Sequence, residues 1–199
     1  MTKSKKSSSL MSYAGTFGAL VILCVVLAIA SPNFFKYSNM MSVLKQTSFN
    51  ALVSTGMLLC LITAGIDLSV GANATFAACL AGMVVNKGMN IPVLLLGVAI
   101  VGGTLIGWIN GMLLTRLHLP HPFVSTLGMK NVLWGGALII TNSQMVSFSG
   151  NDAVMWLGSK TVGGFPVSFI VVLIIYVIMH ILLTKTALGR SIYCVGGNP

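Results

Sequence analysis

Residues 91–115 read IPVLLLGVAIVGGTLIGWINGMLLT and contain no acidic or basic side chain. A helix needs about 20 apolar residues to cross a bilayer, so this stretch is long enough to span one. A bilayer accepts an apolar exterior but requires the backbone groups to be paired within the chain, which favours helices. The stretch therefore predicts a transmembrane α-helix.

The whole chain has the same character, because 56% of its 199 residues are hydrophobic and only 7% are charged. A soluble domain carries roughly one quarter charged residues on average. The segments that are long enough, or nearly long enough, to span a bilayer are residues 11–30, 43–64, 68–85, 91–115, 123–141 and 165–184. We therefore predict an all-α fold, a polytopic transmembrane helical bundle of about six spans, with a long polar loop at 142–164.

The domain organisation follows from these segments. Residues 1–10 form a predicted cytoplasmic leader, 11–184 the transmembrane region, and 185–199 a cytoplasmic segment. The start could instead be a cleaved secretory signal, but its apolar core is longer than the roughly 7–15 residues of such a signal, which favours an uncleaved first span.

Basic residues predict the orientation of the spans. Of the lysines and arginines, only Lys3, Lys5 and Lys6 cluster, and they precede the first apolar segment. Cytoplasmic segments of membrane proteins are enriched in these residues, so we place the N-terminus in the cytoplasm. Six crossings then put Arg116, Lys185 and Arg190 inside as well, and Lys36, Lys45, Lys87 and Lys160 outside.

The composition argues against several functions. The net charge of +9 is spread between apolar blocks, whereas a nucleic-acid-binding protein gathers its cations on one face, so we expect no nucleic-acid partner. The four cysteines lack CxxC spacing and a neighbouring His, so no metal site is predicted. No GxSxG, HExxH or GxxxxGK[ST] motif occurs, so we predict neither an enzyme nor a cofactor.

Small residues form a row in the fourth segment, at Ala99, Gly103, Gly107 and Gly111. Residues four apart share a helix face, and small ones allow a neighbouring backbone to approach closely, so we predict a helix-packing seam. The third segment has a similar row at Ala74, Ala78 and Gly82, and the two rows could pack together.

The sequence GIDLSVG at 65–71 interrupts two apolar segments and holds Asp67, the only acidic residue outside the 142–164 loop. One interpretation is a helix stop at Gly65 and a restart, with Asp67 or Ser69 capping the next helix. The other is a broken helix whose Asp faces a polar cavity, because intramembrane carboxylates usually mark a pathway or a bundle interior. The two interpretations are compatible, and both stay open.

Five fragments, in order, resemble the permease subunit of ATP-binding-cassette importers for ribose and related monosaccharides. They are SPNFF at 31–35, QTSFNA at 46–51, GIDLSVG at 65–71, FVSTLG at 123–128, and TALGR at 186–190 followed by Tyr193 and VGGNP at 195–199. The resemblance covers nearly the whole chain.

The resemblance implies a permease in the bacterial inner membrane that pairs with a second permease copy, an ATP-binding subunit that hydrolyses ATP, and a periplasmic sugar-binding protein. It also implies that the C-terminal segment begins the region coupled to the ATPase, with candidates Gly189, Arg190, Gly196, Gly197 and Asn198. Polar side chains at bilayer depth need a partner or water, so the pathway candidates are Asn50, Thr63, Asp67, Ser69, Asn110 and Thr126.

In the family, further spans follow the GGN segment, whereas this sequence ends at Pro199. Two interpretations stay open at this point. The chain is a monosaccharide permease, or it is a truncated, non-transporting remnant or structural membrane subunit of the same ancestry.

Overall fold

The structure is a computed structural model that describes residues 4–116 and 122–197, with side chains from residue 13 onward. Its helices are α1 (Ser4–Ala30), α2 (Tyr37–Ile62), α3 (Val70–Asn86), α4 (Pro92–Arg116), α5 (Pro122–Thr141), α6 (Asp152–Ser159), α7 (Val167–Lys185) and α8 (Ala187–Gly197), with the strands β1 (Thr161–Val162) and β2 (Phe165–Pro166). The predicted all-α fold class is confirmed. The chain divides into two units, Met1–Leu44 and Lys45–Pro199.

The first unit contains α1 and the start of α2. Helix α1 begins at Ser4, inside the predicted leader of residues 1–10. Phe34 and Phe35 in the following turn pack edge to face with ring centroids 4.9 Å apart. The Asn39 side-chain amide donates to the Phe34 carbonyl at 2.8 Å, which ties this turn to the first turn of α2.

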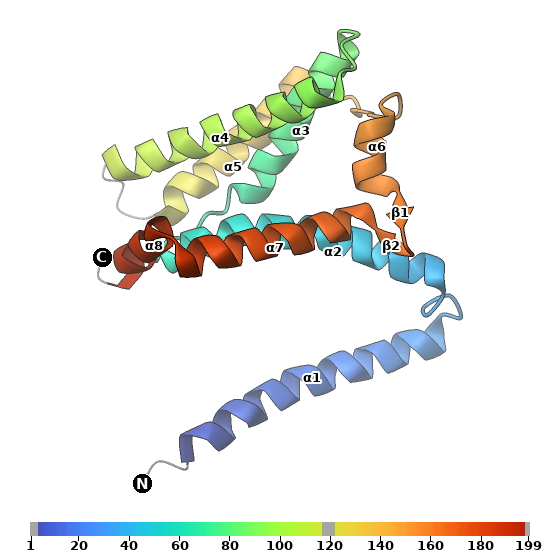
Figure 1. Cartoon of the computed structure of the whole chain (residues 1–199), viewed down its shortest axis with the longest axis vertical. Coiled ribbons are helices and arrows are strands. Elements are labelled where there is room, and N and C mark those ends of the chain that lie inside the picture. Colours follow the sequence, from blue (N-terminus) through green and yellow to red (C-terminus); the bar gives the residue numbers. More distant parts are fainter. Residues whose placement is uncertain (1–3, 117–121, 198–199) are drawn as a thin grey trace. The chain divides into compact units, whose positions relative to one another are not determined.

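In the second unit, α3 packs against both α4 and α5 (Figure 1). Helix α3 can approach both neighbours closely because its buried residues Ala72, Ala77, Ala81 and Gly82 are small. Larger buried side chains from the neighbouring helices, Leu95 of α4 and Leu133 of α5, complete this core.

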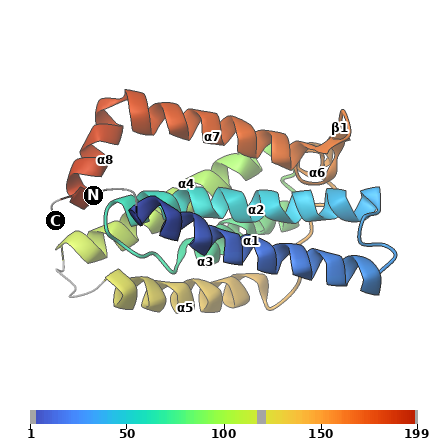
Figure 2. The same ribbon diagram turned by 90° about the horizontal axis from the view of Figure 1, so that it is seen from below.

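Different segments of the chain lie at the two ends of the second unit (Figure 1). At one end, the turn between α3 and α4 is linked to the start of α6, because the Asn151 side-chain amide donates to Asn90 Oδ1 at 2.8 Å. At the other end lie the segment between α2 and α3 and the C-terminal helix α8. Figure 2 shows the corner at which α8 turns away from α7 toward α2.

The predicted polar loop at 142–164 is partly wrong, since it contains α6 and β1. Asn151 starts α6 because its side-chain oxygen accepts the Val154 N–H at 3.0 Å.

The last apolar segment also begins later than predicted. Phe165 and Pro166 form β2, which pairs with β1, and α7 starts at Val167.

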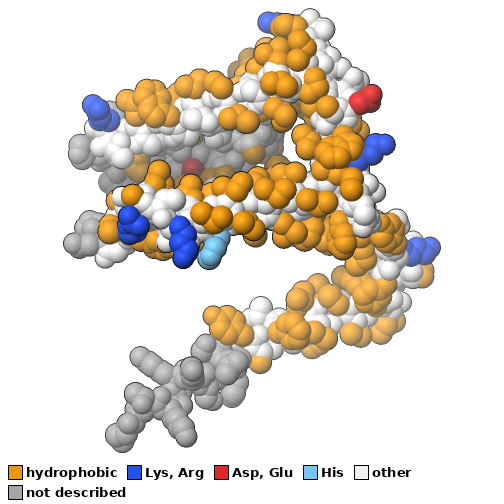
Figure 3. All heavy atoms as spheres, in the orientation of Figure 1, with side chains coloured by type: hydrophobic (Ala, Val, Ile, Leu, Met, Phe, Trp, Pro, Cys, Tyr) orange, Lys and Arg blue, Asp and Glu red, His pale blue; other side chains and the backbone are white. Residues whose placement is uncertain are grey.

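Apolar side chains cover most of the visible exterior, and lysine and arginine side chains lie toward the helix ends (Figure 3). Within the described residues, four helical stretches are long and apolar enough to cross a membrane: Tyr13–Ala30, Pro92–Arg116, Pro122–Thr141 and Val167–Lys185. Helix α3 is a shorter apolar helix of 17 residues, and α2 carries Lys45 and Gln46 in its first half. The number of six spans stays a prediction.

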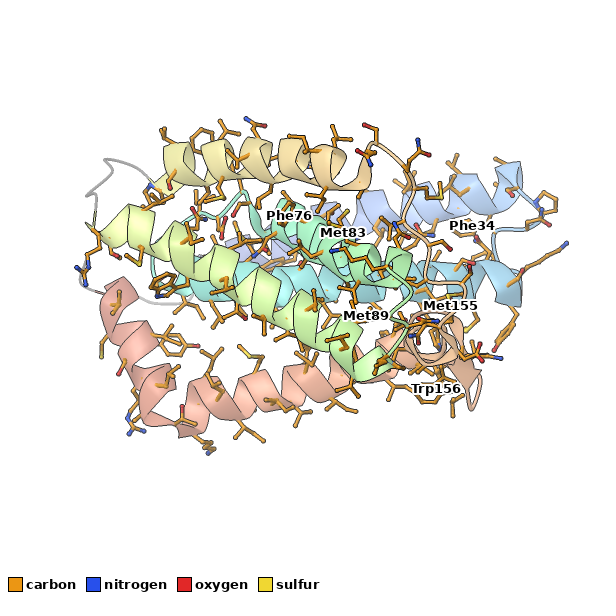
Figure 4. All side chains as sticks on the ribbon, turned by 90° about the horizontal axis from the view of Figure 1, so that it is seen from above. Phe34, Phe76, Met83, Met89, Met155 and Trp156 are labelled. Carbon is orange, nitrogen blue, oxygen red and sulfur yellow. The ribbon has the colours of Figure 1, made fainter. Side chains whose placement is uncertain are left out.

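Helices α3 and α5 meet closely at Phe76 and Gly136. Figure 4 labels Phe76 on α3, and a Cβ added to Gly136 of α5 would lie 2.9 Å from the Phe76 ring, so the two helices meet closely here. Met155 and Trp156 project from α6 at the same end as Met89 of the α3–α4 turn (Figure 4).

We predict that Ala81→Phe destabilises the helix packing, because Ala81 is buried and an inserted large side chain in a packed core costs about 1–3 kcal/mol. Ala78→Phe, on an exposed position of the same helix, is the matched control and should have little effect. Thermal unfolding in detergent measures both. Equal losses in the two variants would contradict the packing described here.

Candidate functional site

The site begins at the interruption between α2 and α3, residues 63–69, which are not helical. Helix α2 ends in a Schellman motif, in which the Gly65 N–H donates to the Cys60 carbonyl at 2.9 Å and the Ala64 N–H to the Leu61 carbonyl at 3.1 Å. The left-handed residue of the motif is Ala64, with φ 59°. The predicted stop at Gly65 is therefore wrong by one residue.

Gly65 still has a physical reason to be glycine. A Cβ added there would lie 3.4 Å from the Cys60 carbonyl oxygen, the group that its N–H reaches. Its small size favours this close return of the chain, whereas its freedom to take a positive φ is not used. Residue type alone does not separate these two uses of glycine, which explains the error.

Asp67 accepts two hydrogen bonds in the segment that leads into α3. Its Oδ1 accepts the Ser69 backbone N–H at 2.8 Å and the Ser69 hydroxyl at 2.6 Å. Ser69 occupies the N-cap position of α3, but its side chain makes no capping hydrogen bond. Asp67 therefore shapes the segment that leads into α3, and it leaves the Ser69 oxygen able to accept another hydrogen bond.

Asn110 of α4 joins this segment to two further helices. Its Nδ2 donates to the Ser69 Oγ at 3.1 Å, and its Oδ1 accepts the Ser125 hydroxyl of α5 at 3.3 Å. Ser69, Asn110 and Ser125 are only 2%, 7% and 9% exposed. Buried polar groups are stable only when they are paired, so this chain of hydrogen bonds holds α4 and α5 to the interruption.

Thr126 makes a second link to the interruption. Its hydroxyl lies 3.4 Å from the Ile66 carbonyl and 3.3 Å from the Phe123 carbonyl of its own helix. The hydroxyl hydrogen can be donated to either oxygen. The start of α5 is thus held to the segment between α2 and α3 from two consecutive residues, Ser125 and Thr126.

These groups surround a cavity of about 160 Å³. It is lined by Cys60, Thr63, Gly65, Ile66, Asp67, Gly107, Asn110, Gly111, Leu114, Pro122 and Thr126. Four predicted pathway residues, Thr63, Asp67, Asn110 and Thr126, thus share one cavity, and Ser69 is hydrogen-bonded to its wall. The cavity is smaller than the roughly 300–1,000 Å³ of pockets that enclose drug-sized ligands.

Asn50 does not belong to this group. It is exposed on α2, about 18 Å along the helix axis from Ile62 at a rise of 1.5 Å per residue. Ser125 and Cys60, in contrast, were not among the predicted residues. The polar pair Ser125 and Thr126 in an apolar segment is the signal that could have identified Ser125, although consecutive residues point about 100° apart on a helix.

The row of small residues on α4 contacts two different parts of the protein. Gly103 faces α3, since the Asn73 amide donates to its carbonyl at 3.0 Å and a Cβ added to it would lie 3.7 Å from Ala77 Cβ. Ala99 lines a separate groove beside Ala74 and Gly103. Gly107 and Gly111 line the cavity around Asp67. Because glycine has no side chain, these two positions leave room next to Asn110.

The row expected on α3 differs from the buried one. Ala78 is exposed, whereas Ala77 and Ala81 are buried, and Gly82 contacts Val146 of the segment between α5 and α6. A turn takes 3.6 residues, so positions four apart drift around the helix and leave the contact face.

The C-terminal candidates lie on α8. Gly189 is buried against the Leu182 and Leu183 backbone, Arg190 is exposed, and Gly197 has open space around it. Gly196 contacts the backbone of Ile62 and Thr63, at the edge of the cavity. Asn198 lies outside the described residues.

The arrangement offers a carboxylate, an amide and several hydroxyls inside an apolar bundle. Within residues 4–116 and 122–197, no three His, Cys, Asp or Glu side chains gather as metal ligands would. The site therefore suits reversible hydrogen bonding to a polar molecule and the joining of helices. These features define a helical membrane protein with a polar site among its apolar helices.

Residues 39–199 match the family of the permease component of the branched-chain amino acid transport system. The chain belongs to this family. It is 33% identical to the ribose import permease protein of Haemophilus influenzae over 92% of this chain, and 36% identical to that of Bacillus subtilis over 94%. It is also 36% identical to the D-allose transport system permease protein of Escherichia coli over 92% of this chain.

The resemblance predicted from the five motifs is confirmed, and the family is one of permease components rather than of enzymes. The chain spans 57%, 58% and 56% of the length of these three relatives. No solved structure matches the chain.

We predict that Asp67→Ala destabilises the protein by about 0.5–2 kcal/mol, because the Ser69 N–H and hydroxyl lose their shared acceptor. Asp67→Asn keeps a carbonyl oxygen in the same place and should cost clearly less. Asp152→Ala, at the other acidic residue, is a control outside the site. Unfolding in mixed micelles measures all three, and equal losses for Asn and Ala at position 67 would contradict the role assigned to Oδ1.

Proposed function

We propose that this chain forms part of the permease of an ATP-binding-cassette importer that carries a ribose-like monosaccharide across the bacterial inner membrane. The observation that carries the proposal is the similarity, over more than nine tenths of the chain, to import permeases named for ribose and allose. The polar side chains that line the cavity give that similarity a physical counterpart, because sugar hydroxyls need hydrogen-bonding partners within the membrane.

The proposed pathway passes the cavity. Thr63, Asp67, Ser69, Asn110 and Thr126 supply donors and acceptors there, and Asn50, on a separate part of α2, is left out of this assignment. No pair of groups in the cavity resembles a nucleophile and its base. The proposed role is therefore passage of an unchanged sugar, with ATP hydrolysed by a separate subunit.

The proposed orientation follows the two ends of the second unit. The end that holds α8 carries Arg116, Lys185 and Arg190, so we place it in the cytoplasm together with the N-terminus. The end that holds α6 then faces the periplasm, where a sugar-binding protein would dock. Helix α8, with Arg190 exposed, would meet the ATP-binding subunit, and a second permease copy would complete the path.

Reconstitution tests the function. The chain, produced with its ATP-binding subunit and sugar-binding protein, should co-purify with the ATP-binding subunit and support ATP-dependent uptake of labelled ribose into vesicles. Unlabelled ribose, allose, fructose and galactose as competitors would rank the substrates. We expect Asp67→Ala to reduce uptake by at least about tenfold, since a pathway carboxylate is lost.

A control variant, Thr104→Ala at an exposed position of α4 that does not line the cavity, should leave uptake intact. Absence of both co-purification and uptake, with well-folded partners present, would contradict the proposal. That result would favour a non-transporting member of the same family.

A further inference from the structure

Helix α8 approaches the backbone at the end of α2 closely at Gly196. A Cβ added to Gly196 would overlap the carbonyl oxygen of Ile62 and would lie 2.7 Å from the Ile62 carbonyl carbon and 3.2 Å from Thr63 Cα. Atoms at these distances leave no room for any side chain at position 196. The contact therefore fixes where α8 and the last turn of α2 lie relative to each other.

The other end of α8 is held as tightly to α7. The Thr186 hydroxyl donates to the Leu182 carbonyl at 2.6 Å and accepts the Gly189 N–H at 3.1 Å, which caps α8. A Cβ on Gly189 would lie 2.6 Å from Leu183 Cα. Gly189 and Gly196 are seven residues apart and share a helix face, so α8 forms a bracket between the ends of α7 and α2.

The end of α2 is also the wall of the cavity. Cys60 and Thr63 line it, and the chain continues from Thr63 directly to Asp67. A displacement of Ile62 is passed through the five peptide bonds between Ile62 and Asp67, and from Asp67 through Ser69 to Asn110. Because the cavity of about 160 Å³ is small for a ligand pocket, passage of a sugar requires it to widen.

We infer that α8 controls the opening of the Asp67 cavity through the contact of Gly196 with the end of α2. Gly196 is a positioning residue: while α8 lies against Ile62, the cavity stays small, and when α8 moves away, the end of α2 is released and the cavity opens. One part of this inference rests on the proposed function, namely that an ATP-binding subunit moves α8. The contacts of α8 with α7 and α2, which form the bracket, do not depend on sugar or ATP.

The chain contains a native reporter for this opening, the Cys60 thiol in the cavity wall. In a variant with Cys24, Cys79 and Cys194 changed to Ala, the rate of Cys60 alkylation by N-ethylmaleimide is measured in lipid nanodiscs. Gly196→Ala forces α8 away from Ile62 and should accelerate this reaction at least about fivefold, the lower end of typical coupling between sites. Alanine favours helix, so α8 itself should stay intact.

Gly197→Ala is the matched control, because it adds the same methyl group to the next residue, where nothing lies within 4 Å. It should leave the Cys60 rate unchanged. Equal rates in the Gly196→Ala variant and the parent, or equal acceleration by both substitutions, would overturn the inference. Size-exclusion chromatography and far-UV circular dichroism verify that each variant is folded.

A reciprocal measurement covers the case in which Gly196→Ala does not fold. Coupling between two sites acts in both directions, so loosening the segment at Asp67 must loosen α8. Hydrogen–deuterium exchange of the α8 backbone amides, whose residue Gly189 is buried, measures this loosening: Asp67→Ala should accelerate the exchange, and Asp152→Ala should not. Unchanged exchange of α8 in the Asp67→Ala variant would overturn the bracket.

The outcomes separate the bracket from the proposed function. Failure of ribose uptake with Cys60 accelerated by Gly196→Ala would reject the function and keep the bracket. Ribose uptake by the parent with no change at Cys60 would keep the function and reject the bracket. In an active importer, Gly196→Ala should also raise the ATP hydrolysed per sugar transported, a ratio that a general loss of folded protein does not change.

Discussion

A helix that stops inside an apolar bundle leaves carbonyl and N–H groups that lipid cannot satisfy, and each unpaired group costs several kcal/mol. Residues 63–69 meet part of this constraint with protein groups. The Gly65 N–H donates to the Cys60 carbonyl, Asp67 Oδ1 accepts two hydrogen bonds from Ser69, and the Thr126 hydroxyl lies 3.4 Å from the Ile66 carbonyl. These hydrogen bonds support the interruption of the chain beside α4 and α5.

The rest of the second unit is arranged around that interruption. Asn110 and Ser125 extend its hydrogen bonds into α4 and α5, while Gly107 and Gly111 leave the space that becomes the cavity. Helix α8 reaches the same place from the other direction through Gly196. One short segment thus joins the polar cavity to the helix that we propose to contact the ATP-binding subunit.

Several features of the fold and the site could be predicted from the sequence, and those that could not be predicted have physical reasons. A carboxylate in the glycine-flanked interruption allowed two interpretations, a capped helix restart and a broken helix whose Asp67 faces a polar cavity, because a buried carboxylate requires partners. Asn110 was predicted as a pathway residue, but its partners Ser69 and Ser125 could not be predicted because they are distant in sequence. The contact of Gly196 with α2 has no local pattern, because any glycine at a helix end would look the same.

The central claim is that Ser69 and Asn110 hold the interruption and α4 together through their hydrogen bond, and a double-mutant cycle tests it most directly. Ser69→Ala, Asn110→Ala and the double variant are unfolded in bicelles, and the free energies are compared with that of the parent. We expect a coupling energy of about 0.5–1.5 kcal/mol between the two positions, as for a buried interhelical hydrogen bond. Strictly additive losses would contradict it.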